Sequence, residues 1–131
     1  MSKVIGYKDL VAAAEARIRS ITAEEAIPIL GAEDVVFVDL RDIRELKREG
    51  GIPGAFHCPR GLLEFWIDPD SPYHHEIFAE PKEFVFFCNL GWRSALAADI
   101  AQQMGLNTCH IDGGFKAWKA LGGDVAEAKR R

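Results

Sequence analysis

The sequence predicts an α/β domain in which a central parallel sheet has helices on both faces. Residues 35–38 and 84–87 are runs of four apolar residues. They lack the alternation of a half-exposed strand, as is typical of parallel strands that are buried on both faces. Strand-like and helix-like segments alternate along the chain, which favours a parallel sheet with helical connections. The 131 residues are enough for one domain with a real core.

The N-terminal segment is expected to add an amphipathic helix that packs on this domain. Its apolar residues recur at helical spacing, and they are Tyr7, Leu10, Val11, Ala14 and Ile18. We prefer packing on the domain to a dimer contact. A capping box at 22–25 then opens a short helix, which Pro28 limits, and residues 18–21 are able to form a short edge strand.

The middle of the chain continues the alternation. The strand at 35–38 ends on Asp39 and Arg41, at the carboxyl edge where open α/β sheets bind ligands. A charged helix is expected at 43–49, followed by a turn and a short strand that Pro59 stops. Another helix begins at residue 61.

The last part carries a surface loop and the central unit of the fold. Residues 68–81 are rich in Pro, Asp, Ser and His, and they predict a loop with one turn that forms a wall of the site. The buried strand at 84–87 runs into a helix from 94 to 104, and a strand at 108–111 precedes a last helix. We place the N-terminal helix at 1–20, the domain at 21–124 and a frayed polar tail at 125–131.

Cys88 stands between the buried strand and the N-terminus of the helix that follows. Unpaired N–H groups and the helix dipole favour an anion at that point, so a thiolate is favoured there. Gly91 lets the loop curl so that its amides point to one centre, and Arg93 adds a fixed positive charge. We therefore prefer a reactive Cys88 to an inert buried cysteine. The expected anion-binding loop consists of Asn89, Leu90, Gly91, Trp92, Arg93 and Ser94.

Composition excludes several classes of function. The net charge of −4 argues against nucleic acid or an anionic membrane as the main partner. The sequence has neither an apolar run of transmembrane length nor the apolar core of a signal peptide, so we expect a cytoplasmic protein. Its three cysteines are too few and too far apart to indicate a disulfide framework or a zinc site. We expect no metal and no cofactor.

Four motifs, in order, resemble those of the rhodanese-like sulfurtransferases. Residues 88–94 match the Cys-x-x-Gly-x-Arg-Ser loop of that family. Residues 38–41, 52–55 and 112–118 look like its other landmarks, so the resemblance extends from residue 35 to 121. It implies a single rhodanese domain with a central parallel sheet and helices on both faces.

The resemblance also implies an enzyme that carries sulfur on Cys88. The thiolate would take a sulfane sulfur from thiosulfate or from a protein persulfide, and would pass it to cyanide or another thiophilic acceptor. Its partners would then be small sulfur compounds or a sulfur-carrier protein. Arg93 would contact the donor's oxygens or pin the loop through a carboxylate such as Asp39, and we prefer pinning. Asp39 and Arg41 are expected to support the site.

Two other functions occur on similar folds. Phosphatases and arsenate reductases carry the arginine one residue further from the cysteine, whereas four residues separate Cys88 from Arg93 here. This spacing favours sulfur transfer. A non-catalytic binding module is the main alternative, and the presence of both Cys88 and Arg93 counts against it.

Two departures from the family pattern, the uncharged loop and Gly51, concern details. Asn89, Leu90 and Trp92 are uncharged, which predicts poor use of thiosulfate. Trp92 would cover the persulfide, contact a carrier protein or pack the loop. Gly51 replaces a usual histidine, and we expect an effect on packing. Cys58 would resolve an oxidised Cys88 if it lay nearby, but a small buried residue is the preferred interpretation.

Overall fold

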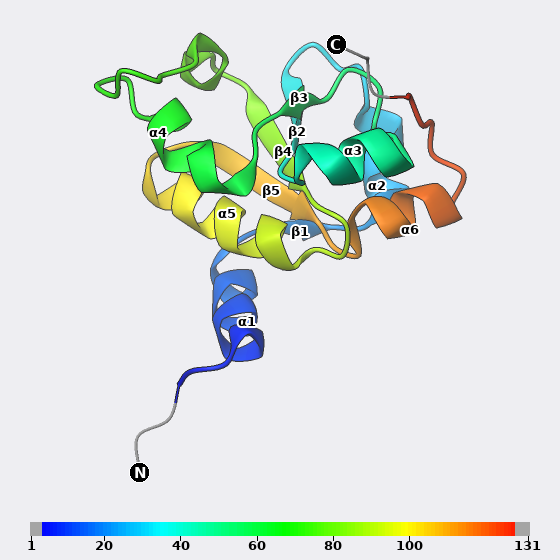
Figure 1. The fold of residues 1–131 in the computed structure, drawn as a ribbon, viewed down its shortest axis with the longest axis horizontal. Coiled ribbons are helices and arrows are strands. Elements are labelled where there is room, and N and C mark those ends of the chain that lie inside the picture. The colour runs from blue at the N-terminus through cyan, green and yellow to red at the C-terminus, as the bar shows by residue number, and fades with distance from the viewer. Residues whose placement is uncertain (1–3, 128–131) are drawn as a thin grey trace.

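The structure is a computed structural model in which residues 4–127 are described, and its centre is a five-stranded parallel sheet (Figure 1). The strand order is β1-β5-β4-β2-β3, and every pairing in it is parallel. The strands are β1 (Ser20–Ile21), β2 (Val35–Asp39), β3 (Phe56–His57), β4 (Glu83–Phe87) and β5 (Asn107–Ile111). This architecture confirms the predicted fold class.

Six α-helices lie within residues 4–127. They are α1 (Tyr7–Arg17), α2 (Ala23–Ala26), α3 (Ile43–Glu49), α4 (Leu63–Ile67), α5 (Trp92–Gln103) and α6 (Gly114–Ala120). Short 3-10 helices add η1 (Ile27–Ile29), η2 (Arg60–Leu62) and η3 (Glu76–Ala79). The predicted capping box at the start of α2 is confirmed, because Thr22 and Glu25 exchange the expected hydrogen bonds.

Strand β4 shows why its apolar run lacks alternation. Phe84 and Phe86 face a core shared with α4 and α5, whereas Val85 and Phe87 face a second core shared with α2 and α6. All four side chains are buried. Successive side chains of a strand point to opposite faces, so a strand covered on both faces must be apolar at every position.

Helix α1 packs on α5 outside the two main cores. Val11 and Ala14 contact Ala95, and Arg17 forms a two-bonded ion pair with Asp99, at 2.9 and 2.6 Å. In Figure 1, α1 stands out from the body of the domain on the side of α5 and β1. The predicted amphipathic helix at 1–20 therefore corresponds to a helix at Tyr7–Arg17.

The chain after α6 returns to the domain. Ala126 forms an antiparallel bridge with Gly51, with two N–H···O bonds of 2.8 Å. A β-carbon at position 51 would lie 2.7 Å from the Leu46 side chain, so no larger residue fits without a shift. Of the tail predicted to fray at 125–131, residues 128–131 lie outside the described part, and the rest is held by this bridge.

The loop at 68–81 lies at the opposite end of the sheet from Cys88. It leads into the first residue of β4, and its residues His74, Phe78 and Ala79 line a cavity together with the C-terminal end of α5 and Leu106. Cys88 follows the last residue of β4 and precedes the N-terminal end of α5. The prediction that this loop forms a wall of the site is therefore wrong.

Candidate active site

Cys88 lies at the carboxyl edge of the sheet, where β4 passes into the N-terminus of α5. Its side chain is almost fully buried, and its Sγ accepts a hydrogen bond of 3.2 Å from the N–H of Gly91. The sulfur therefore sits at the floor of a tight loop that aims a backbone donor at it. Such a donor stabilises negative charge on sulfur.

Gly91 makes this curl of the loop possible. It is the residue before the first turn of α5, and its φ is 102°, in the left-handed region that favours glycine. A β-carbon there would also lie 3.2 Å from the backbone nitrogen of Gly113. Both the backbone conformation and the close approach of the neighbouring loop require glycine at this position.

The N-terminus of α6 holds the loop from outside. The N–H of Phe115 donates to the carbonyl of Cys88 at 2.8 Å, and the N–H of Lys116 donates to the carbonyl of Asn89 at 3.1 Å. A β-carbon on Gly114 would lie 2.5 Å from the Cys88 carbonyl. With its carbonyls bound outside, the loop keeps its amides for its inner side, and the close approach to the Cys88 carbonyl requires glycine at position 114.

Arg93 is bound by Glu45 of α3. Its Nη1 donates to Oε1 at 2.7 Å, and its Nη2 donates to Oε2 at 2.9 Å. These bonds from Arg93 lower the pKa of the Glu45 carboxyl group and raise that of the guanidinium. The geometry is that of loop pinning through a carboxylate, and that carboxylate is Glu45 and not Asp39, the example named from the sequence.

Asp39 and Arg41 form a buried pair beside the site. Asp39 accepts from Nε and Nη2 of Arg41 at 2.9 and 2.7 Å, and Nη2 also donates to the carbonyl of Gly50 at 2.8 Å. The guanidinium carbon lies 4.3 Å from the centre of the Phe115 ring. The pair thus joins the end of β2 to the end of α3 and to α6, the elements that hold Arg93 and the Cys88 loop.

Ser94 connects Cys88 to His110, a residue that was not predicted from the sequence to belong to the site. Its Oγ lies 3.7 Å from Cys88 Sγ and 2.9 Å from Nδ1 of His110 in β5. His110 is fully buried, and this burial lowers its pKa, against the opposite effect of Asp112. No local sequence pattern marks His110, because its position follows from the pairing of β5 with β4, the strand that precedes Cys88.

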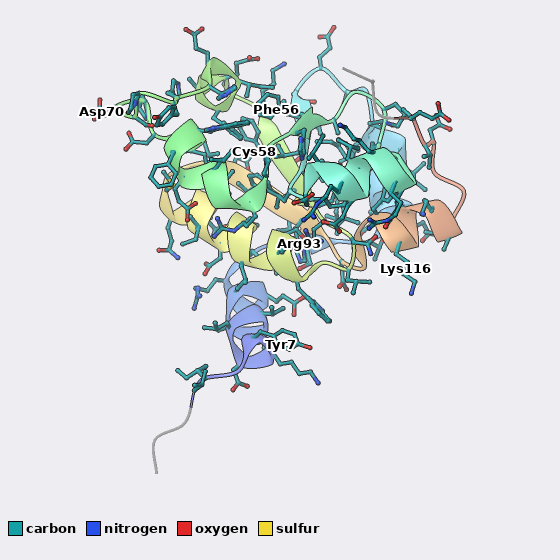
Figure 2. The ribbon with its side chains drawn as sticks, viewed as in Figure 1. Tyr7, Phe56, Cys58, Asp70, Arg93 and Lys116 are labelled. Atoms are coloured by element: carbon teal, nitrogen blue, oxygen red, sulfur yellow. The ribbon has the colours of Figure 1, made fainter. Side chains whose placement is uncertain are left out.

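The outer rim of the loop is apolar. Leu90 and Trp92 are 42% and 48% exposed, and the Trp92 ring lies 4.8 Å from that of Tyr7 in α1. Figure 2 shows Tyr7 on α1, projecting from the helix outside the body of the domain. Of the three predicted roles of Trp92, the structure thus gives direct geometry for packing.

Cys58 packs in the core shared with α4 and α5. It is fully buried among core residues that include Leu63 and Phe86, and burial raises its pKa to about 12. In Figure 2, Cys58 is labelled on the side of β3 and α4. These surroundings are those of a small buried residue, which was the preferred interpretation.

Within residues 4–127, no group of three or more His, Cys, Asp or Glu side chains is placed to hold a metal ion. None of the helices in that range is long and apolar enough to cross a membrane.

The family model described as the rhodanese-like domain matches residues 22–121. The chain therefore belongs to the rhodanese-like family, as the four sequence motifs indicated. The site at Cys88 lies within the matched range.

Individual relatives are similar over most of the chain. A putative sulfurtransferase of Bacillus subtilis is 32% identical over 66% of this chain and 76% of its own. The mouse thiosulfate sulfurtransferase/rhodanese-like domain-containing protein 3 is 29% identical over 86% of this chain and 74% of its own. A solved structure from Rhodopseudomonas palustris, of a protein of unknown function described as a possible tyrosine phosphatase, is 52% identical. It superposes with a TM-score of 0.91 over 96% of this chain and 99% of its own.

Proposed function

We propose that this protein is a sulfurtransferase in which Cys88 carries a sulfane sulfur as a persulfide. Membership of the rhodanese-like family and the sulfurtransferase names of two relatives support this class of reaction. The observation that carries the proposal is the Gly91 N–H donated to Cys88 Sγ within a short loop whose arginine is already paired with Glu45. Such a loop stabilises the negative charge of one sulfur atom, whereas its paired arginine is not free to bind a larger oxyanion.

The reaction has two displacement steps at sulfur. First, the Cys88 thiolate attacks the outer sulfur of the donor, forming a new S–S bond while the donor's own bond to that sulfur breaks. The donor's remainder leaves with the bonding electron pair, as sulfite in the case of thiosulfate. Second, the acceptor attacks the terminal sulfur, takes it, and returns the electron pair to Cys88.

The loop's part in these steps is electrostatic. The Gly91 N–H and the positive end of α5 face the sulfur before transfer, and they favour the anionic form of both thiolate and persulfide. Because these groups are fixed by α6 and by Glu45, no reorganisation is needed during the reaction.

The donor is proposed to be a persulfide rather than a strongly anionic compound. Within the loop, Asn89, Leu90 and Trp92 carry no charge, and both terminal nitrogens of Arg93 donate to Glu45. A dianion such as thiosulfate would find little positive charge beyond the backbone amides. A persulfide carried by a protein or a small thiol needs less positive charge in the loop than a dianion does.

Phosphate hydrolysis is a second candidate, because the 52% identical structure is of a protein described as a possible tyrosine phosphatase. A phosphate dianion would need the Arg93 guanidinium, and Glu45 would have to release it. Each partner lies within 2.9 Å of the other in a two-bonded arrangement that favours the paired state. This favours the sulfur reaction.

One experiment tests both functions on the same variants. The protein is incubated with thiosulfate or a small-molecule persulfide, and intact mass is expected to show one added sulfur atom that cyanide removes as thiocyanate. Cys88→Ser should abolish the addition, whereas Cys58→Ser should leave it intact. Failure of both donors, together with Cys88-dependent hydrolysis of an aryl phosphate, would replace the proposal by a phosphatase.

A further inference from the structure

We propose that Ser94 and His110 relay the proton of the Cys88 thiol from the buried site to Ser20 at the surface of the domain. The proposal deepens the proposed function and rests on Cys88 being its reactive thiol. It assigns a positioning role to His110, which lies outside the four family motifs and comes from the strand beside β4.

The need for a relay comes from burial. The Cys88 and Ser94 side chains are almost completely closed to solvent, and Gly91 above them is also buried. A thiol must lose its proton before it attacks a donor, and the proton needs an acceptor within hydrogen-bond reach. Ser94 Oγ, 3.7 Å from the sulfur, is within that reach.

The inner half of the relay joins three elements. Cys88 follows β4, Ser94 lies in the first turn of α5, and His110 belongs to β5, opposite Phe86 of β4. The distance from Ser94 Oγ to His110 Nδ1 is 2.9 Å. The Ser94 hydroxyl group therefore bridges the Cys88 thiol and the imidazole ring of His110.

The outer half leads to the surface through the N-terminal segment. His110 Nε2 lies 3.1 Å from Oγ of Ser20, the residue that pairs with His110 in the β1–β5 ladder. Ser20 is exposed. Glu15 of α1 has its carboxylate 4.0 Å from the same nitrogen, and its side chain is 41% exposed. The chain of hydrogen bonds therefore begins at a buried sulfur and ends in water.

The proton transfer converts this series of hydrogen bonds from one state to another. In the thiol state, Cys88 donates to Ser94, Ser94 donates to Nδ1 and Nε2–H donates to Ser20. The S–H bond breaks as Ser94 takes the proton and passes its own to Nδ1, after which the Nε2 proton leaves by way of Ser20. The thiolate then accepts from Ser94, and His110 remains neutral in its other tautomer.

The groups around His110 suit this exchange. Burial keeps the pKa of His110 below its usual value, so the neutral ring offers one nitrogen as an acceptor in either state. The ionisable groups facing it are Cys88 through Ser94, Glu15 from α1 and Asp112 after β5. Asp112 favours a transient positive charge on the ring.

The test is the pH dependence of Cys88 alkylation by iodoacetamide, measured by peptide mass spectrometry. Alkylation needs no sulfur donor, so its outcome is independent of whether sulfur transfer occurs. His110→Gln places an amide near Nε2 but none at Nδ1. Without the Nδ1–H that holds the Ser94 hydroxyl group as a donor to sulfur, the thiolate state loses stabilisation. The pH midpoint is therefore expected to move upward by about one unit, which is roughly tenfold slower reaction at pH values below the midpoint. The plateau at high pH should remain.

A matched control is Thr108→Val on the same strand, which removes a buried hydrogen bond to the carbonyl of Ala98 and should leave the midpoint in place. Ser20→Ala tests the outer end, and an upward shift of about half a unit is expected. If His110→Gln does not fold, Ser94→Ala and Ser20→Ala carry the test. Unchanged midpoints in these variants, or a lost plateau with an unchanged midpoint, would overturn the relay.

Discussion

The guanidinium of Arg93 and the carboxylate of Glu45 form a two-bonded ion pair, with N···O distances of 2.7 and 2.9 Å. Glu45 also accepts the N–H of Asp42 at 3.0 Å and so completes the capping box of α3. One carboxylate therefore fixes both the start of α3 and the position of the Cys88 loop. The orientation of Arg93 depends on a helix that lies 48 residues earlier in the chain.

The first prediction concerns Glu45→Gln. The substitution removes the ion pair and leaves Arg93 able to turn toward the site, so we expect the KM for thiosulfate to fall several-fold. The free energy of unfolding should fall by about 1 kcal/mol, because Arg93 is 39% exposed and the pair is partly screened. Steady-state kinetics and urea unfolding measure the two effects.

Glu49→Gln is the matched control for this variant, because Glu49 ends the same helix and pairs only with its neighbour Arg48, at 3.2 Å, among the described ion pairs. It should leave the KM unchanged. Equal kinetics of the two variants would mean that the Arg93 pair does not limit the use of an anionic donor.

The second prediction concerns pH. Hydrogen bonds from Arg93 hold the folded-state pKa of Glu45 below its usual value of 4.5. A lowered folded pKa means that Glu45 contributes its stability above the unfolded pKa and loses it as the pH falls through the folded one. The difference in unfolding free energy between wild type and Glu45→Gln should thus be constant near neutral pH and shrink in acid, below about pH 4.5. A difference that grows in acid would contradict this assignment.

The third prediction separates backbone strain from loop chemistry. Gly91→Ala should destabilise the fold by about 1–3 kcal/mol and abolish persulfide formation, since it strains a φ of 102° and displaces the N–H that faces Cys88. Gly105→Ala is the control, because Gly105 has a φ of 107° and no atom near its β-carbon position. It should cost similar stability and keep sulfur transfer. If both variants lost activity alike, backbone strain would be responsible, and not the loss of the Gly91 N–H that faces Cys88.

The sequence predicted the elements and the loop because both depend on local patterns. The apolar run before Cys88 and the capping box at 22–25 each reflect a local requirement, which the structure meets. The spacing of Cys88 and Arg93 could likewise be read directly. None of these needs knowledge of how distant segments pack.

The partner of Arg93 and the place of His110 could not be predicted, because they depend on packing between distant segments. Several carboxylates were available to Arg93, and only the position of α3 selects Glu45. A histidine in a buried strand carries no local pattern. The wrong placement of the loop at 68–81 was avoidable, because a loop that leads into a parallel strand lies at the edge opposite to a residue that follows it.

The last prediction concerns the contact between Tyr7 and Trp92, whose ring centres lie 4.8 Å apart with planes tilted by 47°. Both rings are about half exposed, at 47% and 48%, so they stabilise α1 against the loop without filling a core. Tyr7→Ala and Trp92→Ala should each cost about 1 kcal/mol of stability, and a double-mutant cycle should give a coupling of about 0.5–1.5 kcal/mol.

If the contact between Tyr7 and Trp92 serves packing alone, both variants should keep the wild-type lifetime of the Cys88 persulfide. Intact mass measures this lifetime. Phe65→Ala, at an aromatic that is 55% exposed on α4, controls for the loss of a surface ring. A persulfide that decays faster in Trp92→Ala but not in Tyr7→Ala would instead make Trp92 a cover over the sulfur. The reason is that Trp92 belongs to the loop and Tyr7 does not. Removal of Tyr7 therefore leaves the indole ring on the loop.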